Sequence, residues 1–189
     1  MKTVVITGGT SGIGRGLART YLDRGERAVV IGTNKTRSEP SALFLQADLE
    51  LIDENRRLID QLPAELDTID VLILGARFQR SRRTESADGL ESNFALSYLS
   101  RFLLNFPGTV ATSFAGAYDE AEAAQIGRLR ATGKPVEAAV REILPFLDSG
   151  SPGRPVAVSE GIAISLDPQA SSPADARRLY AYTREVLVR

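Results

Sequence analysis

A glycine-rich turn near the N-terminus has the residue types that hold a phosphate. Residues 7–14 read Thr-Gly-Gly-Thr-Ser-Gly-Ile-Gly. Gly8 can turn the chain sharply, Gly12 removes a Cβ where a pyrophosphate would approach, and Gly14 lets a helix pack closely. The N–H groups of the first helical turn would then face the anion. The residues predicted to meet it are Gly8, Thr10, Ser11, Gly12, Ile13 and Gly14.

The segments that flank this turn decide between phosphate binding and simple packing. Residues 2–7 form a β-branched apolar run, typical of a strand buried on both faces. Residues 14–24 place apolar side chains at helical spacing, and Gly25 ends them. A second strand-like run follows at 27–32. In this strand–turn–helix–strand context we favour dinucleotide binding over a structural turn.

Strands and helices continue to alternate beyond the second strand. Further strands are expected at 43–47 and 69–74, with an amphipathic helix at 51–62 that ends before Pro63. Pro40 argues against a full helix between the second and third strands. The alternation predicts an α/β fold with a Rossmann-like, doubly wound parallel sheet.

After the fourth strand the pattern changes, and the helices are longer. The chain length suits one domain over 1–189, with a dinucleotide-binding core in 1–105 and a C-terminal cover in 106–189. The expected elements are an apolar helix at 88–105, a helix at 117–132, a helix from Pro135, a strand or a hairpin about Gly161 at 155–166, and a last helix from Ser172 and Pro173.

The residues after the second strand bear on which dinucleotide binds. An acidic residue at the end of that strand would accept a hydrogen bond from the ribose 2′-hydroxyl of NAD, and none stands there. Thr33, Asn34 and Lys35 follow instead, with Arg37 beyond them and Arg15 at the start of the helix. Such groups suit a 2′-phosphate, although Lys35 and Arg37 could equally be solvated loop charges. We predict NADP rather than NAD, chiefly because the acid is missing.

Two further strand ends are placed to meet the same cofactor. Asp48 could accept a hydrogen bond from the adenine amine while Leu49 packs on the ring. Asp48 could equally be the N-cap of the following helix. The tip of the fourth strand, Gly75, Ala76 and Arg77, is expected to approach the middle of the cofactor.

The composition excludes several classes of site and partner. The chain has no cysteine and no histidine, which excludes thiolate and His-based catalysis and makes a metal site improbable. With 23 basic and 24 acidic residues it lacks the basic face that nucleic-acid binding requires. No apolar run reaches transmembrane length, and no signal-peptide pattern is present. We therefore expect a cytoplasmic protein without a membrane or nucleic-acid partner.

The chain resembles the short-chain dehydrogenase/reductase family, and within it the retinol-dehydrogenase-like branch. The turn at 7–14, Asp48-Leu49, the DVLILGAR strand end and the helix at 88–105 carry the resemblance. It resumes at FPGTVATSF, which is similar to the family segment beside the nicotinamide, and continues to the C-terminal helix. The resemblance implies an NAD(P)-dependent oxidoreductase with a small-molecule carbonyl or alcohol substrate, which forms a homo-oligomer. It adds Pro107, Gly108 and Thr112 to the expected cofactor-binding residues.

The catalytic segment of that family is missing between Asn105 and Phe106. Family members carry there a serine, a Tyr-x-x-x-Lys helix and two strands, about 60–80 residues in all. None of the lysines of this chain stands four residues after a tyrosine. Tyr180 and Arg184 have that spacing, but we expect them on a helix surface far from the cofactor. No catalytic residue is therefore predicted.

This gap leaves three functions open. The chain is an oxidoreductase whose catalytic segment exists or is replaced, a catalytically incomplete NADP-binding protein (sensor, scaffold or partner subunit), or an enzyme of another reaction class on the same fold. The join at Asn105 and Phe106 is either a true deletion or the mark of a missing segment. A sheet that is shortened or interrupted after the fourth strand would expose an apolar edge, which a second copy or a rearranged C-terminal half would have to cover.

Overall fold

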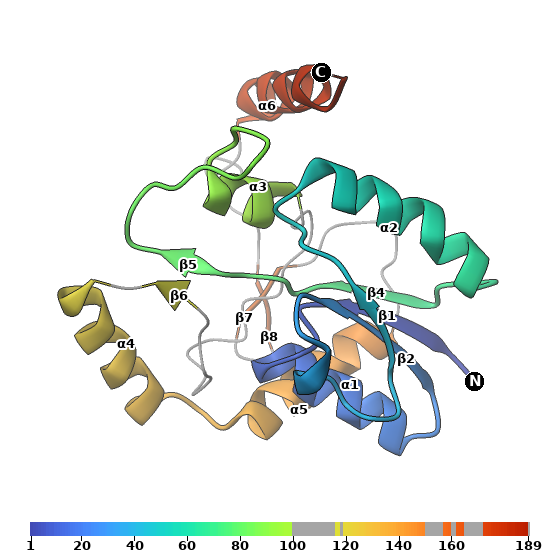
Figure 1. Cartoon of the computed structure of the whole chain (residues 1–189). Helices are drawn as coiled ribbons and strands as arrows, with labels where there is room; N and C mark the ends of the chain where they lie inside the picture. Colours follow the sequence, from blue (N-terminus) through green and yellow to red (C-terminus); the bar gives the residue numbers. More distant parts are fainter. Residues whose placement is uncertain (100–115, 118, 150–156, 160–161, 165–171, 189) are drawn as a thin grey trace.

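A parallel sheet of four strands forms the centre of the molecule (Figure 1). The structure is a computed structural model that describes residues 1–99, 116–117, 119–149, 157–159, 162–164 and 172–188. The strand order is β3-β2-β1-β4, and every pair is parallel. The strands are β1 (Thr3–Thr7), β2 (Arg27–Gly32), β3 (Leu43–Gln46) and β4 (Val71–Leu74). The predicted α/β fold is confirmed.

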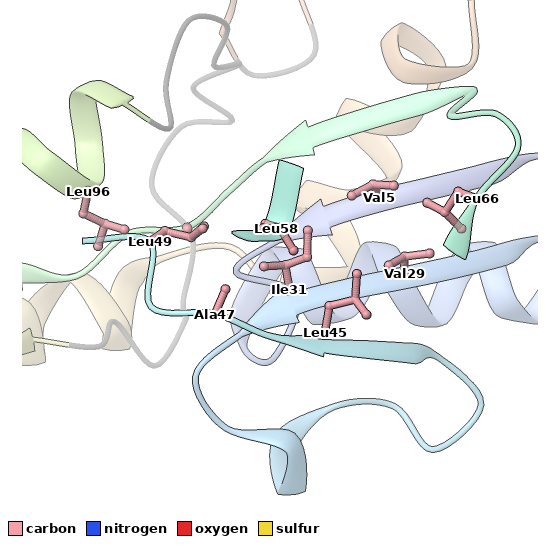
Figure 2. Packing of buried hydrophobic residues seen from close by; sticks show 10 residues of the cluster. Val5, Val29, Ile31, Leu45, Ala47, Leu49, Leu58, Leu66 and Leu96 are labelled. Atoms are coloured by element: carbon pink, nitrogen blue, oxygen red, sulfur yellow. The ribbon is translucent and has the colours of Figure 1, made fainter. Parts of the chain in front are cut away.

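Helices cover both faces of this sheet, as a doubly wound fold requires. On one face, α1 (Gly12–Asp23) and α5 (Val136–Asp148) pack against Val4 and Ile6. On the other face, α2 (Ile52–Glu65) and α3 (Ser92–Leu99) contribute Leu58 and Leu96 to the cluster that contains Val5, because successive strand residues point to opposite faces. With both faces buried, β1 and β2 need uninterrupted apolar sequences. The residues of the second face labelled in Figure 2 are Val5, Val29, Ile31, Leu45, Ala47, Leu49, Leu58, Leu66 and Leu96.

The remaining elements surround this core. The hairpin interpretation of 155–166 is confirmed, because β7 (Ala157–Ser159) and β8 (Ile162–Ile164) pair in antiparallel fashion. The edge of the Tyr182 ring meets the Phe94 ring at 6.5 Å between centroids, which joins the last helix to α3. Among the described helices, none is long and apolar enough to cross a lipid bilayer. The elements that surround the core are η1 (Lys35–Arg37), β5 (Gln79–Arg80), β6 (Gly116–Ala117), α4 (Glu120–Thr132), β7 (Ala157–Ser159), β8 (Ile162–Ile164) and α6 (Pro173–Val188).

The helix expected at 51–62 extends further than the sequence predicted. It passes through Pro63 and ends at Glu65. Proline removes one helical hydrogen bond and crowds the preceding turn, so a break was the natural expectation. The N–H of Leu66 donates to the carbonyl of Leu62 at 2.9 Å, and the Leu66 side chain is buried. Closure of the last turn and this burial offset the proline.

Two other helices begin later than predicted. The helix expected at 88–105 starts at Ser92, because the Glu91 carboxylate accepts hydrogen bonds from the N–H groups of Asn93 and Phe94 at 3.0 and 2.6 Å. Its predicted continuation over 100–105 lies outside the described residues. The helix expected at 117–132 starts at Glu120, since Ala117 pairs with β5.

Candidate functional site

The carboxyl ends of the four strands bring four of the predicted binding segments to one edge of the sheet: the glycine-rich turn, the residues after β2, the end of β3 and the tip of β4. The N–H of Gly8 donates to the carbonyl of Ile31 at 2.8 Å, and the N–H of Gly75 donates to that of Thr7 at 3.1 Å. The N–H of Ala47 donates to Gly32 at 3.0 Å in the same way. The strand order reverses between β1 and β4, which is where ligands bind in sheets of this topology.

The glycines of the turn are required by its backbone and its contacts. Gly8 and Gly12 have φ of +72° and +51°, the left-handed region that favours glycine. A Cβ on Gly8 would lie 2.8 Å from the backbone of Ala76, and one on Gly14 would lie 2.5 Å from the Gly8 carbonyl oxygen. The predicted sharp turn at Gly8 and close helix packing at Gly14 are thus confirmed. Gly9 was not singled out from the sequence, but a Cβ on it would lie 2.9 Å from the Val30 side chain of β2.

The start of α1 is arranged to receive an anion. Ser11 is the N-cap, in extended conformation, and its side chain does not cap the helix. The first N–H groups of a helix have no intrahelical acceptor, and they carry the positive end of the helix dipole. The first turn of α1 contains no acidic residue, whereas that of α2 contains Asp53 and Glu54. Of these two helices, α1 is therefore the one suited to a phosphate.

The residues after β2 lie on the surface beside the glycine-rich turn. Thr33, Asn34 and Lys35 are exposed. The side-chain Oδ1 of Asn34 accepts hydrogen bonds from the N–H and hydroxyl of Thr36 at 3.0 and 2.7 Å, which fixes the short η1 turn. A Cβ on Gly32 would meet the Thr10 methyl group at 3.1 Å, so the Thr10 side chain lies over the end of β2. These contacts join the two predicted phosphate-binding segments.

An acidic residue that was not predicted from the sequence lies between α1 and the segment after β2. Glu39 follows η1, and its Oε1 accepts hydrogen bonds from Arg15 Nε at 2.7 Å and Arg19 Nη2 at 3.1 Å. The Glu39 side chain is only 12% exposed. Desolvation by itself would raise the pKa of Glu39, but the hydrogen bonds and charges of Arg15 and Arg19 outweigh it and lower that pKa. Arg15 and Arg19 are four residues apart in α1, and this spacing of two cations was the sequence signal for an acidic partner such as Glu39.

The end of β3 shows one correction and one additional ion pair. Asp48 is exposed and accepts a hydrogen bond from the N–H of Glu50 at 3.1 Å, whereas the N-cap of α2 is Leu51, so the N-cap alternative for Asp48 is wrong. Leu49 is buried in the cluster with Leu96 (Figure 2). Adenine contact by Asp48 or Leu49 stays a prediction. Glu50 Oε1 forms an ion pair with Arg80 Nη2 at 2.7 Å, which connects the end of β3 to the chain beyond β4.

The tip of β4 is held against β1 at the same edge. The N–H of Ala76 donates to the Thr7 hydroxyl at 3.2 Å, and Ala76 is buried. Gly75 and Arg77 on either side are exposed. The tip of β4 therefore lies next to the glycine-rich turn, as predicted. The other predicted cofactor residues, Pro107, Gly108 and Thr112, lie outside the described residues.

Tyr180 and Arg184 are not brought to this edge. Both belong to α6, which lies beyond α3 and away from β1 and α1 (Figure 1). Their predicted place on a helix is confirmed. Tyr98 of α3 stacks on the Phe94 ring at 5.0 Å between centroids.

Comparisons with known proteins give the family of the chain. The family model described as short chain dehydrogenase matches residues 2–126. An uncharacterized oxidoreductase of Saccharomyces cerevisiae is 35% identical over 105 residues, which cover 53% of this chain and 34% of the yeast protein. Retinol dehydrogenase 12 of Mus musculus is 30% identical over 117 residues, or 56% of this chain and 37% of the mouse protein.

A solved structure supports the fold over most of the chain. It is described as a short chain dehydrogenase/reductase family protein, with a TM-score of 0.53 at 21% sequence identity, and the match covers 85% of this chain and 96% of that one. The curated relatives are longer, and the chain spans only about a third of their length. The matched family residues include the whole four-stranded sheet and the glycine-rich turn. The chain belongs to the short chain dehydrogenase family.

Proposed function

We propose that the carboxyl edge of the sheet binds NADP(H), and that the protein is an NAD(P)-dependent oxidoreductase acting on a small carbonyl or alcohol substrate. The observation that carries this proposal is the turn between β1 and α1. Two of its glycines have positive φ, and a side chain at Gly8 or Gly14 would collide with neighbouring backbone. The turn brings a helix start without acidic residues to the edge where the strand order reverses between β1 and β4.

The preference for NADP over NAD is supported by the charges near the end of β2. Lys35 and Arg37 are exposed beside Thr33 and Asn34, where an adenosine ribose would lie if the pyrophosphate sits on α1. A 2′-phosphate gains charge-assisted hydrogen bonds from such cations, whereas a 2′-hydroxyl needs an acceptor. Glu39 is engaged by Arg15 and Arg19 and is not offered as that acceptor.

The residues of this chain account for cofactor binding better than for proton transfer. A bound nicotinamide would supply or accept the hydride. The N–H groups of α1 would hold the pyrophosphate, and the packing of Ala76 against Thr7 and Gly8 would fix the floor beneath the cofactor. A carbonyl substrate also needs a group that donates a proton to its oxygen, and the chain has no Tyr-x-x-x-Lys pair for that step.

That missing pair favours one alternative, a catalytically incomplete NADP-binding protein. Two measurements on the purified protein separate the proposals. Oxidation of NADPH in the presence of a panel of aldehydes and ketones would support the oxidoreductase. Saturable NADPH binding without turnover would support the binding protein. Because the join at Asn105 and Phe106 bears on catalysis, the intact mass should be measured first and compared with 20.4 kDa.

We also propose that the protein self-associates. β4 is an outer strand of the described sheet, and the Leu72 side chain on it is 54% exposed. An outer strand with exposed apolar side chains tends to pair with another chain.

A further inference from the structure

We propose that Glu39 tunes the cofactor preference of the site by holding Arg15 away from the ribose 2′-phosphate. The inference rests on the proposed binding of NAD(P) at the carboxyl edge of the sheet. It concerns a residue outside the glycine-rich turn and outside the end of β2. The Glu39 carboxylate and the 2′-phosphate of the cofactor compete for the same Arg15 guanidinium.

Arg15 has the position and the length to reach the cofactor. It stands four residues after Ser11, the N-cap of α1, and therefore about one turn along the helix on the same side. Long helical side chains lean toward the N-terminus of their helix. The Arg15 side chain is 44% exposed. Glu39 lies two residues after η1, so the Arg15 side chain already reaches the segment beyond β2, and if nothing held it its guanidinium could turn to a ribose 2′-phosphate bound there.

The Glu39 carboxylate binds the Arg15 side chain and so keeps it from the phosphate. Its Oε1 accepts the Arg15 Nε hydrogen at 2.7 Å and a second hydrogen from Arg19 Nη2 at 3.1 Å. Charge-assisted bonds of this length are among the stronger hydrogen bonds in proteins. Because Glu39 is 12% exposed and both arginines are bound to one of its oxygens, water screens the pair less than it screens a surface ion pair.

The burial of Glu39 makes this competition hard for a phosphate to win. If Arg15 turned toward a 2′-phosphate, the carboxylate would keep only its longer bond to Arg19. A partly buried charge that loses a partner is costly. The lowered pKa of Glu39 means that it stays ionised at neutral pH. The phosphate is then left to the exposed Lys35 and Arg37, and the preference for NADP is smaller than the number of nearby cations implies.

Four proteins test this competition: wild type, Glu39→Gln, Arg15→Gln and the double variant. NADPH and NADH are titrated into each by calorimetry. For Glu39→Gln we expect NADPH affinity to rise by about tenfold and NADH affinity to change less than about twofold. For Arg15→Gln alone we expect NADPH affinity within about twofold of wild type, since the held arginine contributes little. In the double variant the gain from Glu39→Gln should disappear.

A control variant removes an equivalent ion pair from the other end of α1. Arg24 pairs with Asp148 of α5 at 2.8 Å, and Asp148→Asn removes the negative charge of that pair. We expect it to leave the ratio of NADPH to NADH affinity unchanged. An unchanged or lower ratio in Glu39→Gln, or a gain that persists without Arg15, would overturn the inference. If Glu39→Gln does not fold, a large loss of NADPH affinity in Arg15→Gln would overturn it alone.

The same titrations separate this inference from the function on which it rests. Wild type that binds neither NADPH nor NADH contradicts the proposed function, and the inference fails with it. Wild type that binds either cofactor, together with an unaltered ratio in Glu39→Gln, contradicts the inference alone.

Discussion

The carbonyl oxygen of Gly8 lies 2.5 Å from the position that a Cβ on Gly14 would occupy. The two ends of the glycine-rich turn are therefore in contact, with no room for a side chain between them. Since Gly8 follows β1 and Gly14 lies in the first turn of α1, this contact sets how closely the helix approaches the strand. The position of the helix N–H groups depends on that approach.

Replacement of Gly14 by alanine should destabilise the protein as well as its site. The new Cβ would push against backbone that cannot rotate away, and we expect a loss of about 1–3 kcal/mol in the free energy of unfolding. Urea denaturation followed by circular dichroism measures it. Gly127→Ala is the control, because a Cβ at this α4 position meets nothing within 4 Å. It should be neutral or stabilise by about 0.5–1 kcal/mol. Equal stability of the two variants would contradict the observed packing.

Replacement of Gly12 by valine should abolish cofactor binding. Gly12 has φ of +51°, so part of the effect will be backbone strain. Gly25 provides the match, because its φ is +76° and its Cβ would meet nothing within 4 Å at the far end of α1. Gly12→Val and Gly25→Val should both lose about 1–2 kcal/mol of stability from the left-handed backbone. Only Gly12→Val should lose NADPH binding in a fluorescence titration. Equal binding by both variants would exclude pyrophosphate contact at Gly12.

The phenol of Tyr21 should lose its proton at an unusually high pH. Burial, followed by the charge of Asp148 and its hydrogen bond at 3.4 Å, raises the pKa of Tyr21 from 10.0 to about 12. The stability that this gives is complete below pH 10.0 and is lost as the pH rises toward about 12. Ultraviolet phenolate titration of wild type against Tyr21→Phe isolates the group. Asp148→Asn should lower this pKa, and a pKa that stays at 10.0 in wild type would contradict the burial.

Glu39 should support the fold at neutral pH and lose that role in acid. Its pKa is lowered from 4.5, so its contribution to stability is present above pH 4.5 and declines as the pH falls through the lower value of the folded state. Urea midpoints measured across the acid range should fall less steeply for Glu39→Gln than for wild type. Parallel curves for the two proteins would show that the Arg15–Glu39 bond contributes nothing in solution.

Self-association has its own test in the exposed side chain of β4. Light scattering at micromolar concentration should give a mass above the monomer value of 20.4 kDa. Leu72→Glu should return the protein to the monomer, because a charge on an outer strand disfavours pairing with another chain. A wild-type protein that is already monomeric would contradict the proposed self-association.

The parts of the fold that the sequence predicted are those decided by local chemistry. β1 and β2 are short apolar runs that end in glycine, and a strand buried on both faces has few other forms. The turn at Gly8 was predictable because a glycine that directly follows a strand allows the positive φ that a sharp turn needs. The antiparallel pair of β7 and β8 is one of the two forms, strand or hairpin, that the sequence of 155–166 allowed.

The parts that were not predictable depend on contacts between distant residues. α2 continues past Pro63 because Leu66 finds a place in the core, which no local pattern reveals. Glu39 is 24 residues from Arg15 in sequence, and its position depends on how the chain returns from η1 toward β3. The burial of Leu49 beside Leu96 likewise requires α3 to be in place.

The proposed dinucleotide site is tested most directly by a calorimetric titration of the wild-type protein with NADPH, repeated with NADH and with the Gly12→Val variant. We expect saturable binding of NADPH at micromolar concentration, weaker binding of NADH, and no binding by Gly12→Val. Absence of binding by both cofactors up to millimolar concentration, in a protein shown to be folded, would contradict the assignment of the glycine-rich turn as a dinucleotide site.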